Sequence, residues 1–245
     1  MAAAHADCLL YISGFTKDRF NFRFPVAPQV RQIVTLLSCH YDEYGGGAGR
    51  QSSGDGHILL IGNDFEHKGL ARVLELLPRA FPDQQFIVIG QDNVRCSNVT
   101  TVRSGRTSAA QIERLFADAR MLVFPSFYEG FGFPVVKGLG HGLDVVARRS
   151  DLLAEIGRQC APRGRLVPFD DDASLIAIVA RILAGQAVEV VPLGGDIASG
   201  AQPVRWIDVA RSILALAEDL SAEPSSVVHD GREVALRFAS SRMSR

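Results

Sequence analysis

Short apolar runs alternate with segments of helical periodicity between residues 57 and 183, and this alternation limits the fold more than any other feature of the chain. The runs predicted to be strands are 57–61, 85–89, 99–102, 121–124, 143–147 and 165–167. The segments predicted to be helices are 68–80, 109–119, 134–140, 152–156 and 173–183. Strands that alternate with helices predict an α/β fold with a doubly wound, Rossmann-like parallel sheet.

The run 121–124 is followed by a turn with two glycines, Gly130 and Gly132, and then by Pro134, where a helix can begin. A parallel strand that leads into a helix N-terminus places unpaired N–H groups and a partial positive charge at the carboxyl edge of the sheet. The glycines lack Cβ atoms, so the backbone can approach a ligand closely. Glu129 stands at the mouth of this loop, where a carboxylate can accept hydrogen bonds from hydroxyls. The pattern predicts a phosphate site.

The sequence Glu-Gly-Phe-Gly-x-Pro at residues 129–134 resembles the donor-site signature of retaining glycosyltransferases of the two-domain B-type fold, group 1 or family 4. The resemblance implies that this chain holds the C-terminal, donor-binding half of that fold. It implies that Glu129 contacts the donor sugar and supports charge as the glycosidic bond breaks. It also implies that Gly130, Phe131 and Gly132 offer backbone N–H groups to the phosphates. These transferases work without a metal, so we expect no metal and no cofactor besides the nucleoside-diphosphate sugar.

The loop 62–69 follows the first strand of the alternating region and is expected on the same edge of the sheet. In the resembling enzymes, an arginine after the glycine and a lysine before the next glycine neutralise the diphosphate. The lysine is present as Lys68, whereas Asn63, which donates only neutral hydrogen bonds, holds the arginine position. We expect both residues to bind the donor, with His67 as a further basic group. Alternatively, Lys68 is a solvated lysine without a role in binding. Asp64 and Glu66 are predicted to stabilise a helix N-terminus through their negative charges.

Lys137 departs from the family signature, which has a second glutamate at this position. In the family that glutamate accepts hydrogen bonds from the ribose, and an ammonium has only donors. Losing such bonds, at about 1.5–3 kcal/mol, implies roughly ten- to hundredfold weaker nucleotide binding. Lys137 could instead reach a phosphate, or it could be a structural surface lysine. The sequence alone does not distinguish these two roles. Asp144 is a second departure, because the family has proline there.

The resemblance divides the chain into three regions. Residues 1–55 resemble the end of the N-terminal acceptor domain, followed by a Gly/Ser-rich linker at 45–54. Residues 56–190 form the expected nucleotide-sugar-binding domain, and 191–245 are expected to be a loop, a helix beginning near Trp206 and a tail. We therefore expect most of the acceptor domain to be absent from this chain.

Composition limits the partners and the compartment. The formal net charge is −1, so bulk charge gives no reason to expect a nucleic-acid partner. The four cysteines form no C-x-x-C pair, which favours reduced thiols. No apolar run approaches the roughly 20 residues of a membrane span, and the first residues lack the basic segment of a signal peptide. These features predict a cytoplasmic protein without a transmembrane segment, with peripheral contact at the inner membrane face left open.

The sequence thus predicts a glycosyltransferase that moves a sugar from a nucleoside-diphosphate donor to a glycan or lipid-linked acceptor. The acceptor domain would be supplied by a missing segment or by a partner chain. The alternative is a truncated, non-catalytic homologue that serves as a nucleotide-sugar-binding or interaction module; Asn63 and Lys137 favour it. A sugar-nucleotide epimerase of the same architecture is a third reading, against which the Glu-Gly-Phe-Gly signature argues.

Overall fold

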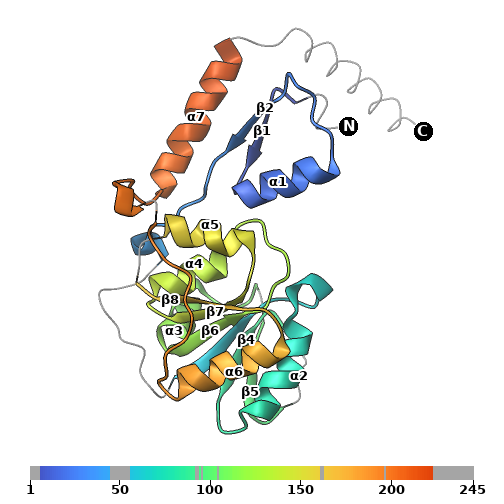
Figure 1. Cartoon of the computed structure of the whole chain (residues 1–245), viewed down its shortest axis with the longest axis vertical. Helices are drawn as coiled ribbons and strands as arrows, with labels where there is room; N and C mark the ends of the chain where they lie inside the picture. The colour runs from blue at the N-terminus through green and yellow to red at the C-terminus, as the bar shows by residue number, and fades with distance from the viewer. Residues whose placement is uncertain are drawn as a thin grey trace, which may run out of the picture. The chain divides into compact units, whose positions relative to one another are not determined.

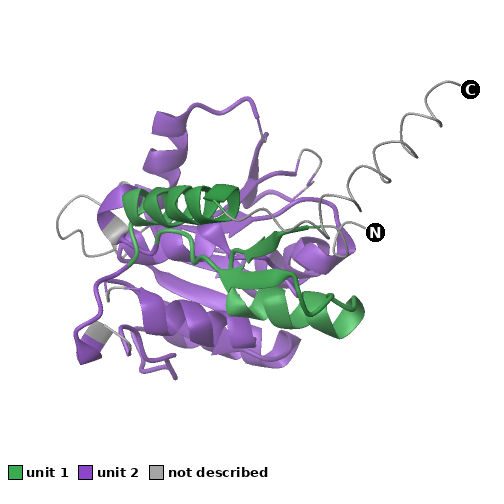
Figure 2. Ribbon diagram, turned by 90° about the horizontal axis from the view of Figure 1, so that it is seen from above, with its two compact units in different colours: residues 1–38, 204–245 green, residues 39–203 purple. Residues whose placement is uncertain are grey.

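The computed structural model describes residues 6–44, 56–91, 94, 96–103, 105–160, 163–195 and 197–222. The chain forms two compact units: unit 1 comprises residues 1–38 and 204–245, and unit 2 comprises residues 39–203 (Figure 2). The predicted linker 45–54 and the tail from residue 223, with its apolar patch 234–238, lie outside the described residues.

Unit 2 is built on a six-stranded parallel sheet with the strand order β5-β4-β3-β6-β7-β8 (Figure 1). The strands are β3 (His57–Ile61), β4 (Phe86–Ile89), β5 (Val99–Val102), β6 (Ala119–Phe124), β7 (Asp144–Arg148) and β8 (Arg165–Phe169). Every neighbouring pair in this sheet is parallel. The predicted doubly wound α/β fold is therefore confirmed, and the predicted strand at 99–102 is β5 at one edge of the sheet.

In the described part of unit 2, four α-helices lie between successive strands and a fifth follows β8. They are α2 (Leu70–Ala80), α3 (Ala109–Ala117), α4 (Phe133–Gly140), α5 (Asp151–Gln159) and α6 (Asp172–Leu183). The same described residues also include three short 3-10 helices, η2 (Tyr41–Tyr44), η3 (Glu66–Lys68) and η4 (Ile197–Ser199). The helix expected over 68–80 begins only at Leu70, because Gly69 has a left-handed conformation, with φ at 62°, that separates η3 from α2.

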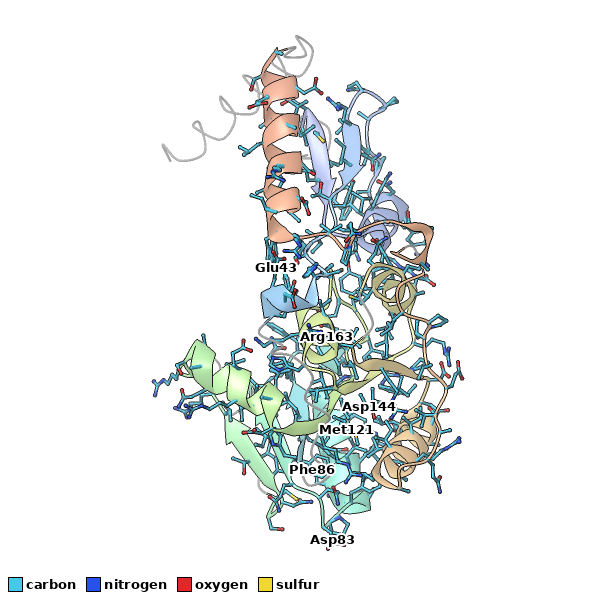
Figure 3. All side chains as sticks on the ribbon, turned by 90° about the vertical axis from the view of Figure 1, so that its left-hand side faces the viewer. Glu43, Asp83, Phe86, Met121, Asp144 and Arg163 are labelled. Atoms are coloured by element: carbon cyan, nitrogen blue, oxygen red, sulfur yellow. The ribbon has the colours of Figure 1, made fainter. Side chains whose placement is uncertain are left out.

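The helices cover both faces of the sheet. On one face, α2 and α6 pack on a core that includes Phe86 of β4 and Met121 of β6, both fully buried (Figure 3). On the other face lies α4, where a Cβ at Gly138 would approach Val145 and Leu122 to within 3 Å. The glycine lets α4 lie close against the centre of the sheet. Each large side chain buried in this way contributes about 1.5–3 kcal/mol of hydrophobic stabilisation.

Two helix starts in unit 2 are stabilised by capping boxes. Ser108 accepts a hydrogen bond from the Gln111 amide, and the Gln111 side chain returns one to the Ser108 amide at the start of α3. Asp171 and Ser174 exchange the same bonds at the start of α6. The hydrogen bond from the Ser174 amide lowers the pKa of the Asp171 carboxyl. Asp171, in the acidic run 170–172, is thus the N-cap of this helix.

The described residues of unit 1 form a two-stranded parallel sheet and two helices: β1 (Cys8–Tyr11), α1 (Gly14–Arg23), β2 (Arg31–Val34) and α7 (Trp206–Ala222). Ser13 caps α1 through a 3.0 Å hydrogen bond from the Thr16 amide. The Tyr11 ring of β1 packs edge-on against Phe20 of α1. An ion pair between Arg31 and Asp219 joins β2 to α7. The strand β2 lies within the apolar-rich segment 30–37.

The structure bears on two expectations from the sequence, that the thiols are reduced and that no transmembrane segment is present. Cys8, Cys39, Cys96 and Cys160 are free thiols. A hydrogen bond with Cys39, together with burial, raises the pKa of the Cys160 thiol well above its usual value. Among the helices that the structure describes, none is both long enough and apolar enough to cross a membrane.

Candidate active site

Two loops meet at the carboxyl edge of the unit 2 sheet. The loop after β3 spans residues 62–69, and the loop after β6 spans 125–132. The Phe127 amide donates a 2.7 Å hydrogen bond to the His67 carbonyl, which joins the two loops through their backbones. The Lys68 Nζ atom lies 2.6 Å from Glu129 Oε1, so the two residues that the sequence analysis favoured most pair directly. The prediction that both loops share one edge of the sheet is correct.

This edge is the topological switch point of the sheet. From β3 the chain moves outward through β4 to β5, and then returns to β6 on the other side of β3. The loops after β3 and β6 therefore leave their neighbouring strands in opposite directions, which opens a crevice between them. Ligands of open α/β sheets bind in crevices of this kind.

A pocket of about 240 Å³ lies in this crevice. It is lined by the ends of three strands and by the loops that follow: Ile61, Gly62, Asn63, Lys68, Ile89, Gly90, Phe124, Glu129 and Pro134. The volume is below the roughly 300–1,000 Å³ of sites that enclose a drug-sized ligand. The pocket can therefore enclose part of a nucleotide sugar, such as its phosphates, but not the whole molecule.

The pair of Lys68 and Glu129 provides the charge of the pocket. Their side chains are 21% and 18% exposed, so water reaches both only in part. A carboxylate accepts hydrogen bonds through two oxygens, and an ammonium carries three donors. After pairing, Glu129 keeps acceptor capacity for a hydroxyl, and Lys68 keeps two donors for an anionic oxygen. The pair can thus hold a hydroxylated and an anionic group of one ligand side by side.

Two glycines allow the chain to pass closely around the pocket. Gly90 has a φ of 103°, and a Cβ there would overlap the carbonyl oxygen of Gly62. Gly132 has a φ of 84° and forms the N-cap of α4, with Pro134 in the first turn. The Val135 amide donates a 2.9 Å hydrogen bond to the Gly132 carbonyl. These positions need glycine because side chains would be strained or would collide.

Gly130, Phe131 and Gly132 form the turn between Glu129 and Pro134, both of which line the pocket. The Phe131 side chain is buried and lies edge-on against Phe133, with ring centroids 5.1 Å apart. The buried ring anchors the turn beside the start of α4. That the three residues bind phosphates through their amides stays a prediction.

Asn63 and His67 take different positions in the first loop. Asn63 lines the pocket, and its Oδ1 accepts a 3.2 Å hydrogen bond from the Phe65 amide. The Asn63 side-chain NH₂ group is left as the donor that a ligand could use. The His67 ring stacks on Phe65 with centroids 5.8 Å apart and is not among the side chains that line the pocket.

Lys137 does not line the pocket. Its ammonium forms an ion pair with Glu113 of α3 and lies 5.3 Å from the centre of the Phe116 ring. The other oxygen of Glu113 lies 3.0 Å from His141 Nε2. The Glu113 carboxylate therefore contacts both Lys137 and His141 at the C-terminal end of α4. This geometry favours the structural reading of Lys137, and substrate binding by this residue stays a prediction. Asp144, the second departure from the signature, pairs with Arg165 through two 2.6 Å hydrogen bonds between β7 and β8.

Arg148, at the end of β7, was not among the predicted site residues. Its guanidinium lies 3.8 Å from the centre of the Phe127 ring and 4.8 Å from that of Phe169. It also donates a 3.2 Å hydrogen bond to the Pro125 carbonyl, at the start of the second loop. Burial lowers the pKa of this guanidinium below its usual value. The signal was available, because an arginine directly after the predicted strand 143–147 must lie at the same sheet edge.

Within the described ranges, no group of three or more His, Cys, Asp or Glu side chains is arranged to hold a metal ion.

The sequence model of the family described as glycosyl transferases group 1 matches residues 55–185, which hold every residue of the pocket. Two curated proteins are similar in sequence. The O-antigen chain mannosyltransferase B of Escherichia coli is 26% identical over 178 residues, which cover 62% of this chain and 45% of that protein. The MMP alpha-(1->4)-mannosyltransferase of Mycolicibacterium hassiacum is 33% identical over 87 residues, which cover 36% of this chain and 21% of that protein.

Solved structures of the same fold extend the similarity beyond the family match. Sucrose-phosphate synthase from Thermosynechococcus elongatus superposes with a TM-score of 0.63 at 20% identity, covering 89% of this chain and 59% of that one. A glycosyltransferase from Rickettsia africae superposes with a TM-score of 0.62 at 12% identity, covering 88% of this chain and 64% of that one. The chain thus spans less than two thirds of the length of each of these relatives.

Proposed function

The chain belongs to the glycosyl transferases group 1, and from this premise we propose that it binds a nucleoside-diphosphate sugar and takes part in transfer of the sugar to a glycan or lipid-linked acceptor. The proposed transfer retains the configuration at the sugar and needs no metal ion. Both curated relatives are named as mannosyltransferases, which supports a mannose donor. Since the chain spans only part of each relative, further acceptor-binding residues would come from a missing segment or a partner chain.

The observation that carries this proposal is the contact between Lys68 and Glu129 in the switch-point pocket. When a glycosidic bond to a diphosphate breaks, negative charge builds up on the leaving oxygen. A preorganised cation beside that oxygen lowers the barrier, since it stabilises charge that is larger in the transition state than in the ground state. We assign that role to Lys68 in this proposal.

Glu129 would act on the sugar side of the same bond. Its carboxylate can accept a hydrogen bond from a sugar hydroxyl and so orient the ring. Its negative charge also stabilises positive charge that develops at the anomeric carbon as the leaving group departs. Asn63, together with the amides of Gly130, Phe131 and Gly132, would complete the phosphate site with neutral donors.

A second candidate function is a nucleotide-sugar-binding or interaction module without catalysis. The engagement of Lys137 with Glu113 favours it, because no carboxylate stands at position 137 to accept bonds from a ribose. The two functions differ in turnover and share the donor site.

Calorimetric titration with uridine and guanosine diphosphates tests the donor site. One of the two should bind, and Lys68→Met should weaken that binding about ten- to hundredfold, as expected for lost hydrogen bonds to a charged group. Lys17→Met is the matched control, since Lys17 lies on α1 of unit 1. If neither nucleotide binds the native protein, the proposed enzyme function is contradicted and an interaction module without a donor site is favoured.

Transfer from a radiolabelled nucleotide sugar separates the two functions. Glu129→Gln keeps the shape of the side chain and removes its charge. If the protein is an enzyme, this variant should keep nucleotide binding and lose transfer. A native protein that binds nucleotide but shows no transfer to any acceptor, even with added partner protein, supports the module.

A further inference from the structure

Exposed aromatic side chains gather beside the pocket. In the described part of unit 2, five large apolar side chains are markedly exposed, and four of them are aromatic. The four lie on the pocket loops or at the start of α4, and we call them the aromatic rim: Phe65, Phe127, Tyr128 and Phe133, which are 65%, 58%, 47% and 44% exposed. The fifth is Val190. Exposed aromatic residues on the loops and the helix start that flank one pocket indicate a binding surface.

Phe127 is held in place by its neighbours. One face of the ring meets the Arg148 guanidinium at 3.8 Å from the centroid. Gly69 leaves little room beside it, because a Cβ there would lie 3.2 Å from Phe127 Cε2. The Phe127 amide is bound to the His67 carbonyl. The ring is thus fixed while more than half of the side chain stays exposed, so a ligand that stacks on it loses little additional side-chain entropy.

The charges around the rim select the kind of ligand. Asp64 and Glu66 flank Phe65 in the sequence, and both are exposed carboxylates. The nearby cations are engaged, Lys68 with Glu129 and Arg148 with the ring of Phe127. Exposed carboxylates accept hydrogen bonds from hydroxyls and repel the phosphates of nucleic acids and anionic lipids. Aromatic faces combined with carboxylates therefore suit a neutral sugar, whose rings have apolar C–H faces and hydroxyl edges.

We propose that the aromatic rim binds a neutral sugar residue of the acceptor, which stacks on Phe127. This inference rests on the proposed function. The rim continues directly into the pocket, because Phe127 and Tyr128 immediately precede Glu129 in the second loop. An acceptor held on the rim is therefore adjacent to the carboxylate beside which the donor sugar would lie.

The experiment is an NMR titration of the full chain with mannobiose, a neutral disaccharide, with and without the nucleotide that binds best. Phe127→Ala should weaken mannobiose binding about fivefold or more, the size of effect expected for a lost aromatic contact. Phe127→Tyr keeps the ring and should bind as the native protein does. Phe22→Ala is the matched control, because Phe22 is a 90% exposed phenylalanine of unit 1. If Phe127→Ala does not fold, Phe127→Leu fills the space beside Gly69 without a ring.

Three results would overturn the inference: no mannobiose binding by the native protein, binding by Phe127→Ala or Phe127→Leu equal to that of the native protein, or Phe127-dependent binding to phosphatidylglycerol vesicles in place of the sugar. The donor site is read separately, since Phe127→Ala should leave the affinity for the nucleoside diphosphate unchanged. Loss of sugar binding with intact nucleotide binding supports the rim. Absence of nucleotide binding in the native protein contradicts the proposed function and leaves the sugar titration as an independent result.

Discussion

Lys137 connects α4 to α3 through its ion pair with Glu113. Because of its position in the family signature, it is also the residue at which the enzyme and the non-catalytic module differ most. The ammonium lies between a carboxylate and the face of Phe116. Both contacts favour a cation at this position, and a glutamate here would place two carboxylates together.

We therefore expect Lys137→Glu to lower the free energy of unfolding by about 1 kcal/mol, since like charges replace a partly exposed ion pair. Urea denaturation measures the change, and Lys17→Glu on α1 controls for the altered net charge. A Lys137→Glu protein that is as stable as the native one and binds nucleotide more tightly would instead show that position 137 still serves a ribose site.

The sequence predicted the residues whose place follows from strand order alone. Lys68 and Glu129 both follow predicted parallel strands, so their meeting at one edge could be inferred before the structure was known. The partner of Lys137 could not be inferred, because Glu113 lies 24 residues away on a different helix and helix rotation is not encoded in spacing. Arg148 could have been found by the strand rule, although its stacking between two rings could not.

At the scale of the element, Gly69 controls how the first loop enters α2. It has a φ of 62°, and a Cβ there would lie 2.8 Å from the Pro125 carbonyl oxygen. The short 3-10 helix η3 ends and α2 begins at this residue, which lets Lys68 reach the pocket while Leu70 turns into the core.

Gly69→Ala should destabilise the protein by about 2–4 kcal/mol, from left-handed backbone strain together with displacement of the second loop. Thermal unfolding measures the loss. Gly105→Ala is the matched control, because Gly105 has a φ of 77° but nothing within 4 Å of its Cβ position. Equal losses for the two variants would show that the contact with Pro125 has no effect.

The start of β3 contains a group that makes stability depend on pH. His57 Nε2 donates a 3.0 Å hydrogen bond to the Leu115 carbonyl near the end of α3. Burial lowers the pKa of His57 below its usual 6.5. Burial likewise lowers the pKa of His141, although Glu113 opposes the shift.

Both histidines bind protons more readily in the unfolded chain, so the free energy of unfolding should fall as the pH drops below about 6.5. Their contribution is fully present above that value. Urea denaturation between pH 7.5 and 5 is the measurement, and His57→Gln should reduce the slope while the double variant with His141→Gln reduces it further. A slope that both substitutions leave unchanged would contradict this assignment.

At the scale of the whole molecule, the alternation of strands and helices was enough to predict the sheet of unit 2, because parallel strands joined by helices have few possible arrangements. The division into units could not be predicted. The sequence analysis placed residues 1–55 and 191–245 in separate regions, whereas unit 1 combines 1–38 with 204–245. Arg31 and Asp219, which link them, are 188 positions apart, and one pair of charges at that separation leaves no pattern in a sequence. That unit 1 is the end of an acceptor domain stays a prediction.

Every residue that lines the pocket belongs to unit 2. A fragment of residues 39–203 should therefore bind the nucleoside diphosphate within about threefold of the affinity of the full chain, a difference of less than about 1 kcal/mol. Calorimetry compares the two proteins, and circular dichroism confirms that the fragment is folded. A folded fragment whose affinity falls more than tenfold would show that unit 1 contributes to the donor site.

The close contact of Lys68 with Glu129 has a consequence for the speed of ligand capture. Opposite charges 2.6 Å apart form a dipole, whose potential decays faster with distance than that of a lone ammonium. A diphosphate that diffuses toward the crevice consequently feels little long-range attraction from this pair, and electrostatic steering is weak. The association rate constant should then vary little with ionic strength, and selection among anions occurs only after arrival, when an incoming phosphate competes with the carboxylate for the lysine.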